Sequence, residues 1–198
     1  MYLSESEYEE KAGKHFTQIT TAINRMSNLL DNVLRISSIE EGKVKLKTGF
    51  VDIKELAEEL KREMELGDNY KHKVKIHIEG EQTGFVSDKK LLIHILSNLL
   101  SNAMKYSPDN EKVELIARIE KEKVVFSVKD YGLGIPEQDH HKLFTRFFRS
   151  DNVFNITGTG LGLTISKEYV DLLNGTINFT SKENEGTTFY VTIPVMVE

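Results

Sequence analysis

The most regular hydrophobic pattern in the chain lies between Lys14 and Glu41. Its apolar residues alternate at spacings of three and four, as in a heptad seam: Phe16, Ile19, Ile23, Met26, Leu30 and Val33. Three more widen this stripe toward a helix that is buried in a bundle: Leu29, Leu34 and Ile36. The pattern predicts one long helix that stops at Gly42. It packs on its own globular domain or, as its length and its place at one end of the chain favour, in a bundle or dimer.

Four segments with other patterns follow this helix. Residues 43–50 are basic and β-branched and predict a short strand. Residues 52–66 begin like a capping box and predict a helix, with Gly67 after it. Residues 72–79 alternate between apolar and polar side chains, which predicts a half-exposed strand. Residues 88–106 predict an unusually apolar helix, capped at its start by Ser87 and Asp88.

The second half of the chain predicts two pairs of strands and one helix. Residues 113–120 and 124–130 form strands that only three residues separate, which is a hairpin signal. Residues 162–173 predict a helix, and residues 175–181 and 187–195 predict two more strands. This order indicates an α+β fold, a two-layer α/β sandwich in which helices cover one face of a mixed sheet.

Composition narrows the class of protein. The 198 residues include 39% hydrophobic and 29% charged residues, as in ordinary soluble globular domains. The net charge of −5 argues against nucleic acid as the main partner. The absence of cysteine excludes disulfides and thiolate metal sites. Because no apolar run is long enough to span a membrane and the first residues are acidic, not a signal peptide, we expect a cytoplasmic protein.

Two asparagines interrupt the apolar helix of residues 88–106. Asn98 and Asn102 are four residues apart and share one face, with Lys105 and Tyr106 one turn further on. A buried amide without a partner costs about 1–3 kcal/mol, so a pair in register next to a lysine suggests a polar seam lining a site. Amide oxygens also suit Mg²⁺. The alternative is that both asparagines simply face solvent.

Two glycine motifs bracket a polar connector later in the chain. The first follows the carboxylate of Asp130 at the end of a strand and reads YGLGIP. A carboxylate placed there can accept a hydrogen bond from an exocyclic amine such as that of adenine. The second motif, GTGLGL from Gly158, opens a helix, and helix N-termini bind phosphate groups. It is neither a Walker loop nor a dinucleotide fingerprint, because Leu163 stands where the third glycine belongs.

Four segments in this order closely resemble the ATP-binding domain of sensor histidine kinases. They are NLLSNAMKYS, DYGLGIP, LFTRFFR in a helix-like segment, and GTGLGL, followed by GTTF near the end. They correspond to the N, G1, F and G2 boxes of that family. The resemblance as a whole spans about residues 43–198. The wider superfamily (GHKL) also contains DNA gyrase B, Hsp90-type chaperones and mismatch-repair ATPases, and its fold is the Bergerat-type ATP-binding sandwich.

The resemblance implies roles for individual residues. Asn98 and Asn102 would hold Mg²⁺, Lys105 would contact a phosphate, and Tyr106 would pack beside the adenine or ribose. Asp130 would accept a hydrogen bond from the adenine amino group.

The glycine and F-box residues would complete the ATP site. Gly132, Gly134 and Ile135 would give the base room, and Thr187 would hydrogen-bond near the adenine. Arg146 and Arg149 are candidates for phosphate contact and, with Asn98, Asn102 and Lys105, form the predicted catalytic set. Aromatic residues would anchor a lid over residues 150–157: Phe144, Phe147 and Phe148. The G2 box would shape the phosphate end and the hinge of that lid: Gly158, Thr159, Gly160, Leu161, Gly162 and Leu163.

One position separates the branches of the superfamily. Its ATPase members carry a glutamate that activates water one helical turn before the metal-binding asparagine, and Asn98 occupies that position here. An amide cannot act as a general base, so phosphoryl transfer to a protein side chain is favoured over hydrolysis.

The resemblance also predicts the domain organisation and the partners. Residues 1–42 would form the second helix of a dimerisation hairpin, and residues 43–198 the catalytic domain of a protein histidine kinase. The family's phospho-accepting histidine is followed by an acidic residue, and none of the six histidines here has that context. The acceptor helix of a homodimer and the receiver domain of a response regulator would be the partners. Each histidine, including the adjacent pair His140 and His141, is interpreted as structural or surface-exposed.

Two other functions stay open at this stage. One is a non-catalytic nucleotide-binding or interaction module, and the other is a clamp-type ATPase. Undetectable Mg·ATP binding would favour the first, and steady-state hydrolysis that depends on Asn98 would favour the second.

Overall fold

The computed structural model describes residues 5–65, 73–80, 83–108, 111–153, 156 and 158–195. Within it the chain separates into two compact units, Met1–Lys43 and Val44–Glu198. The first unit is one helix, α1 (Glu5–Glu40), which begins nine residues before the predicted start at Lys14. Gly42 follows the helix, and its φ of 63° lies in the left-handed region that glycine adopts without strain.

The described residues of the second unit form three helices and seven strands. The strands are β1 (Gly49–Asp52), β2 (Lys73–Glu79), β3 (Gly84–Ser87), β4 (Lys112–Ile119), β5 (Lys123–Lys129), β6 (Thr176–Lys182) and β7 (Gly186–Pro194). The helices are α2 (Ile53–Glu65), α3 (Lys89–Tyr106) and α4 (Gly162–Leu172), with two short 3₁₀ turns, η1 (Glu137–Lys142) and η2 (Asp151–Val153).

The strands form two sheets. β1 and β3 pair as a small antiparallel ribbon, and the other five form a sheet in the order β2-β4-β5-β7-β6. Among the described strands only the pair of β2 and β4 is parallel, so the sheet is mixed, as predicted. The β4–β5 and β6–β7 pairs are antiparallel hairpins, which confirms the hairpin predicted from the three-residue separation in the first pair.

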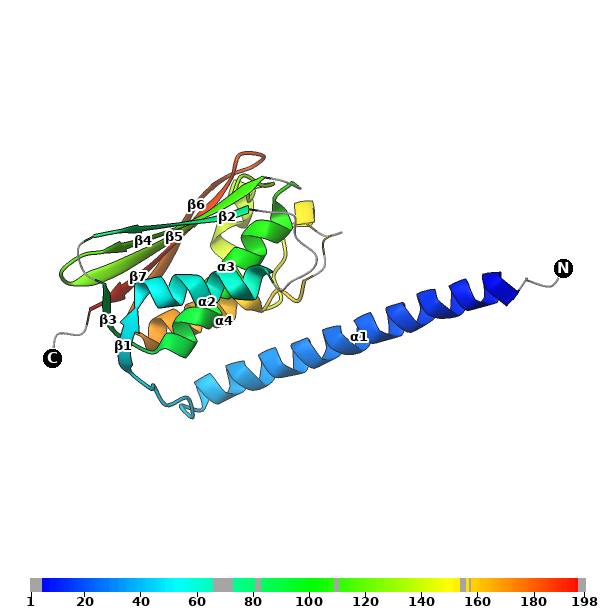
Figure 1. The fold of residues 1–198 in the computed structure, drawn as a ribbon, viewed down its shortest axis with the longest axis horizontal. Coiled ribbons are helices and arrows are strands. Elements are labelled where there is room, and N and C mark those ends of the chain that lie inside the picture. The colour runs from blue at the N-terminus through cyan, green and yellow to red at the C-terminus, as the bar shows by residue number, and fades with distance from the viewer. Residues whose placement is uncertain are drawn as a thin grey trace. The chain divides into compact units, whose positions relative to one another are not determined.

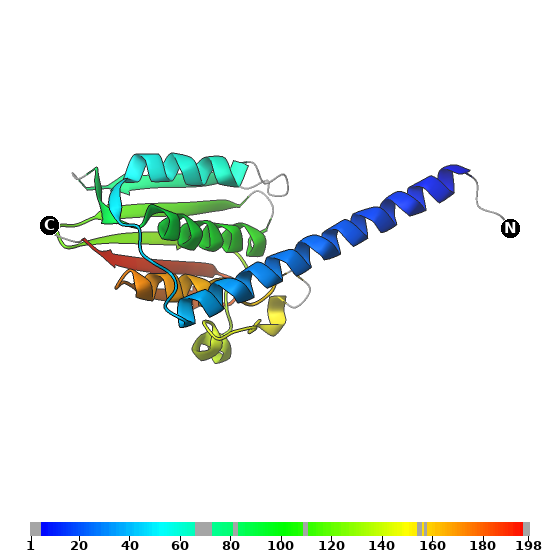
Figure 2. The ribbon, with the colours of Figure 1, turned by 90° about the horizontal axis from the view of Figure 1, so that it is seen from below.

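All three helices of this unit cover one face of the five-stranded sheet (Figures 1 and 2). The strands alternate accordingly, and the helix-facing side chains of β4 and β5 are buried: Val113, Leu115, Ala117, Ile119, Val124, Phe126 and Val128. Between these strands and the helices lies the core, to which α3 contributes eight buried residues. The predicted α+β sandwich is therefore the observed fold.

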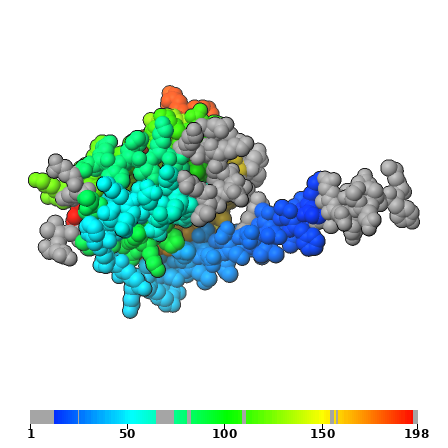
Figure 3. Space-filling view, in the orientation of Figure 1, coloured from blue at the N-terminus to red at the C-terminus, as the bar shows by residue number. Residues whose placement is uncertain are grey.

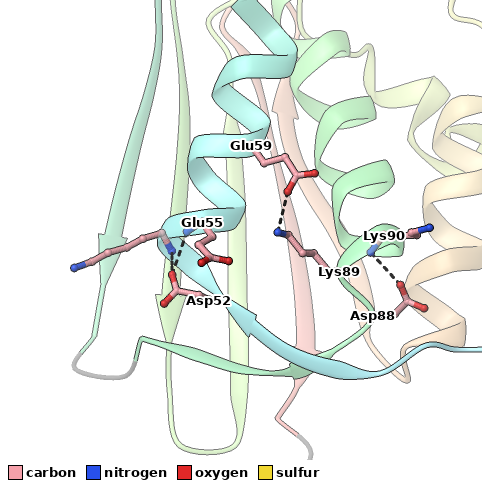
Figure 4. Close-up of polar contacts among 7 residues, drawn as sticks. Asp52, Glu55, Glu59, Asp88, Lys89 and Lys90 are labelled. Atoms are coloured by element: carbon pink, nitrogen blue, oxygen red, sulfur yellow. Dashed lines mark hydrogen bonds and ion pairs between the residues drawn. The ribbon is translucent and has the colours of Figure 1, made fainter.

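Aspartates begin two of the helices (Figure 4). The side chain of Asp88 accepts hydrogen bonds from the backbone N–H groups of Lys90 and Leu91 at the start of α3, as predicted. Its other oxygen accepts from the N–H of Lys47 at 2.7 Å, which joins the segment before β1 to this helix. Asp52 accepts from the N–H groups of Lys54 and Glu55 in the same way at the start of α2.

The outer side of α2 lies on the surface of the unit (cyan in Figure 3). An ion pair between Glu59 of α2 and Lys89 of α3, at 2.9 Å, links the two helices at that surface. Because both side chains are partly exposed to solvent, this pair contributes less than about 1 kcal/mol to stability. The buried leucines beneath, Leu56 and Leu60, hold α2 in place.

Two sequence-based expectations about secondary structure are wrong, and one strand has no counterpart among them. Residues 43–48 form no strand, and pairing begins only at Gly49. The four-residue strand β3 was not predicted. Residues 143–149, which contain LFTRFFR, form turns and no helix. Leu66, Gly67 and His72, which belong to predicted element ends, lie outside the described residues.

Candidate functional site

The second half of α3 carries the polar seam predicted for the site. Asn98 and Asn102 are half-buried on this helix, and Lys105 and Tyr106 follow in its last turn. The Nδ2 of Asn98 donates a hydrogen bond to the Oγ of Ser166 in α4 at 2.8 Å. This bond orients the amide, so that Asn98 does not face solvent as an isolated polar group. Ser166 is a contact that sequence reasoning missed.

Gly162 at the start of α4 lies directly against Asn98. A Cβ atom added to Gly162 would approach the Oδ1 of Asn98 to 2.3 Å. Glycine at this position therefore lets the Asn98 oxygen lie beside the N-terminus of α4 without being displaced. The arrangement accounts for the last glycine of the G2 box, Gly162.

A cationic cluster lies around Gly158. The Nζ of Lys105 donates to the hydroxyl of Tyr106 at 3.1 Å and lies 4.7 Å from the centre of its ring. A Cβ atom on Gly158 would approach this Nζ to 2.8 Å and the Nε of Arg149 to 3.8 Å. Burial, and then the positive charge of Arg149, lower the pKa of Lys105 to about 8. Two cations held this close suit a bound anion.

Arg149 also organises the segment before the G2 box. Its guanidinium donates to the carbonyl of Val153 at 2.6 Å, to that of Gly158 at 3.3 Å, and to that of Ile156. Arg146 lies exposed on the same segment. The lid predicted over residues 150–157 is only partly described, because residues 154, 155 and 157 lie outside the described residues.

Asp130 lies buried at the end of β5. Its Oδ1 accepts hydrogen bonds from the N–H of Gly132 at 2.9 Å and from the N–H of Thr187 at 3.1 Å. Burial raises the pKa of this carboxyl, and the two backbone hydrogen bonds partly oppose that rise. The carboxylate is thus anchored through one oxygen, in the position predicted for an adenine reader.

The glycines around Asp130 allow close backbone approach. A Cβ atom on Gly132 would lie 2.2 Å from the carbonyl oxygen of Tyr106, and one on Gly186 would lie 2.3 Å from that of Asp130. Gly134 has a φ of 60° and faces the carbonyl of Lys182. The G1 turn is therefore packed between the end of α3 and the β6–β7 turn, and no larger residue fits there.

The aromatic residues of the F segment have different surroundings. Phe144 packs edge-on against Phe179 of β6, with ring centres 6.0 Å apart, and its carbonyl accepts from the hydroxyl of Thr164. Phe147 is 62% exposed and has a φ of 61°, a conformation that costs energy for a bulky residue. Its N–H donates to the carbonyl of Gly160 at 3.0 Å, which holds the F segment to the G2 box.

The remaining G2-box residues support this turn. The N–H of Leu161 lies 3.3 Å from the hydroxyl of Thr159, and the Leu161 side chain is fully buried. Gly160 has a φ of 72°, and Leu163 is half-buried in the first turn of α4. Among the residues that the structure describes, no group of three or more His, Cys, Asp or Glu side chains forms a metal site. No helix in the described part of the chain has both the length and the hydropathy to cross a membrane.

Known proteins resemble this chain in sequence. Residues 87–197 match the family described as histidine kinase-, DNA gyrase B-, and HSP90-like ATPase. The circadian input-output histidine kinase CikA of Thermosynechococcus vestitus is 33% identical over 174 residues, which cover 85% of this chain and 24% of that protein. The chain thus spans about a quarter of the length of this curated relative.

Solved structures share the fold. Histidine kinase AdeS of Acinetobacter baumannii superimposes with a TM-score of 0.76 at 21% identity, over 98% of this chain and 87% of that one. Full-length ShkA, solved in complex with AMPPNP, superimposes with a TM-score of 0.79 at 22% identity, over 100% of this chain and 41% of that one. The family match over residues 87–197, which runs from the end of β3 through β7, shows that the chain belongs to the histidine kinase, gyrase and Hsp90-like ATPase family. Together with the histidine kinase relative, it shows that the chain carries the catalytic ATP-binding domain of a sensor histidine kinase.

Proposed function

We propose that this chain binds Mg·ATP and transfers the γ-phosphoryl group to a histidine on the dimerisation helix of a kinase, for relay to a response regulator. The observation that carries the proposal is the convergence of three motifs at the start of α4. Asn98, Lys105 and Arg149 all lie within contact distance of the added Cβ positions on Gly158 or Gly162. A polyphosphate placed there meets two cations and the N-terminus of a helix.

Each group has a distinct role in this proposal. Lys105 and Arg149 neutralise phosphate charge. The backbone of the G2 box can approach the phosphates closely at its glycines, because these residues have no side chain. Asp130 receives the adenine amino group, and Tyr106 packs beside the adenine or ribose. Catalysis is then mainly positioning and charge stabilisation, since neither Asn98 nor Asn102 can accept a proton.

The donor set on α3 fits a magnesium ion. Asn98 and Asn102 would hold it through their amide oxygens, which are hard ligands of the kind that Mg²⁺ prefers. Because the Nδ2 of Asn98 donates to Ser166, the amide oxygen of Asn98 is left for the ion. When bound, the ion would neutralise charge on the phosphates.

The acceptor and the response regulator would come from outside the described units. The complex of ShkA with AMPPNP, an ATP analogue, supports nucleotide binding by this fold. α1 would correspond to the second helix of the dimerisation hairpin, and residues 43–198 to the catalytic domain.

A transfer experiment tests the proposal. The chain is mixed with Mg²⁺, γ-labelled ATP and a separate fragment that carries the acceptor helix of a homologous kinase. We expect acid-labile label on the fragment and none on this chain. Asn98→Ala should abolish the transfer, whereas Asn178→Ala, which removes an exposed amide from β6, should not alter it.

Two outcomes would contradict the proposal. Undetectable Mg·ATP binding by calorimetry would favour a non-catalytic interaction module. Steady-state release of inorganic phosphate that depends on Asn98, without transfer to the fragment, would favour a clamp-type ATPase.

A further inference from the structure

The turn between β6 and β7 is in backbone contact with the G1 turn. The carbonyl of Leu133 accepts a hydrogen bond from the N–H of Asn184 at 2.7 Å. A Cβ atom on Gly134 would approach the carbonyl oxygen of Lys182 to 2.0 Å. The two turns are therefore in backbone contact, although they are far apart in the sequence.

Ser181, at the end of β6, connects these turns through its hydroxyl. Its Oγ lies 2.9 Å from the N–H nitrogen of Ile135, 3.1 Å from the carbonyl oxygen of Gly186 and 2.9 Å from the Oγ1 of Thr187. A hydroxyl has one proton to donate and two lone pairs to accept with. These three contacts use all of that capacity.

The proton count assigns the direction of each hydrogen bond. The carbonyl of Gly186 can only accept, so the Ser181 proton goes to it, and the N–H of Ile135 can only donate. Ser181 Oγ must then accept from the Thr187 hydroxyl. Since the Thr187 proton is used in this bond, its Oγ1 presents only lone pairs to its other neighbours.

The direction of these hydrogen bonds matters because Thr187 is also hydrogen-bonded to Asp130. The N–H of Thr187 donates to the Oδ1 of Asp130 at 3.1 Å, and the N–H of Asp130 donates to the carbonyl of Thr187 at 2.9 Å. A carboxylate and an acceptor-only hydroxyl are thus held on adjacent strands. Together they favour a ligand that brings hydrogen-bond donors.

We propose that Ser181 is a positioning residue for base recognition, which sets the Thr187 hydroxyl as an acceptor beside Asp130 and fixes the Ile135 end of the G1 turn. The site would then prefer a purine with an exocyclic amine over one with an oxo group at the same position. This inference rests on the proposed nucleotide-binding function.

His140 contacts the carbonyl of the same residue, Ile135. Its Nε2 lies 3.0 Å from the carbonyl oxygen of Ile135, so this nitrogen carries the proton, and its ring packs edge-on against Phe179 at 5.0 Å. Ile135 is therefore bonded through its N–H to β6 and through its carbonyl to η1. The G1 turn is fixed at the point where it leaves the site.

Calorimetry with two nucleotides tests the inference. Mg·ATP and Mg·ITP differ in the amine or oxo group of the base. In Ser181→Ala we expect the affinity for ATP to fall about three- to tenfold while that for ITP changes less, so the ATP-to-ITP preference falls. The amide of Ile135 should also exchange with solvent several-fold faster. Thr180→Ala, next to Ser181 but exposed, is the matched control and should alter neither.

Thr187→Val provides a second variant, because it removes the hydroxyl and keeps the backbone bond to Asp130. We expect the same loss of preference for ATP. The inference is overturned if both variants keep the wild-type ATP-to-ITP ratio within twofold, or if Ile135 exchange is unchanged in Ser181→Ala. A wild-type chain that binds neither nucleotide would instead overturn the proposed function.

Discussion

Lys105 is the residue whose ionisation bears most directly on phosphate binding. Burial and the neighbouring Arg149 lower its pKa to about 8. A bound polyphosphate stabilises the protonated form, so affinity should be highest below pH 8 and should fall as the pH rises through that value. We also expect proton uptake on binding near pH 8, measured by calorimetry in two buffers of different ionisation enthalpy.

Lys105→Arg is the control for this pH dependence. Because arginine stays charged, the variant should bind nucleotide with an affinity that is nearly constant between pH 7 and 9. A wild-type affinity that is equally constant over this range would show that Lys105 does not contact the phosphates.

Gly162 leaves room for the Asn98 amide beside the start of α4. In Gly162→Ala the new Cβ must displace the Asn98 amide, because the two would approach to 2.3 Å. We expect Mg·ATP affinity to fall about tenfold or more, since a displaced polar contact of this kind costs about 1–3 kcal/mol. Calorimetry measures the loss.

Gly13→Ala is the matched control for Gly162→Ala. Gly13 lies inside α1, and an added Cβ meets no atom within 4 Å. The substitution should raise helix stability by up to about 1 kcal/mol and leave nucleotide affinity unchanged. Equal loss of affinity in both variants would mean that the effect of Gly162→Ala is not local.

The sequence motifs predicted the residues that line the site better than the residues that support them. Asn98, Lys105 and Gly158 belong to motifs that can be read directly from the sequence. Ser166 and Ser181 carry no such local signal, because their roles depend on contacts between segments that only the folded sheet brings together. For the same reason His140 was interpreted as structural or surface-exposed, without its bond to Ile135.

At the scale of elements, loss of the N-terminal cap should destabilise the domain more at α3 than at α2. Asp88 is buried and accepts three backbone hydrogen bonds, one of them from Lys47. Asp88→Ala should lower the free energy of unfolding by about 2 kcal/mol, at the upper end of the range for helix caps. Chemical denaturation measures this value.

Asp52→Ala supplies the comparison. Asp52 makes two cap bonds at the start of α2 and lies nearer the surface, so the expected loss is about 1 kcal/mol. Because α2 carries none of the proposed site residues, nucleotide affinity should not change. A larger loss for Asp52→Ala than for Asp88→Ala would contradict the role assigned to the contact with Lys47.

Elements with clear periodicity were predicted, and those shaped by distant contacts were not. The alternation in β4 and β5 matched their burial. Residues 143–149 were expected in a helix-like segment, but Phe147 takes a left-handed φ that a helix cannot contain. Its bond to Gly160 stabilises that conformation, and the partner lies in another motif.

At the scale of the whole molecule, α1 exposes the heptad stripe that the sequence revealed. Eight of its large apolar side chains are exposed in the described unit: Phe16, Ile19, Ile23, Met26, Leu29, Leu30, Val33 and Leu34. A stripe of this extent favours self-association. We expect dimers or larger species by light scattering at high concentration.

Ile23→Asp combined with Leu30→Asp should convert the chain to monomers, because both substitutions put charge on the stripe. The affinity for Mg·ATP should stay the same, since the proposed site lies entirely in the second unit. A wild-type chain that stays monomeric at high concentration would count against a role of α1 in a bundle.

The order of strands in the five-stranded sheet has a consequence for how the domain folds. The β4–β5 and β6–β7 hairpins form from neighbouring residues, but the pairing of Val128 with Phe189 joins the hairpins across the whole segment that carries the G1, F and G2 motifs. Closing so long a loop costs conformational entropy before the pairing is formed. This pairing should therefore limit the folding rate. Conservative substitutions at the β5–β7 interface should therefore slow folding, whereas changes in the length of the enclosed segment should alter the rate only slightly.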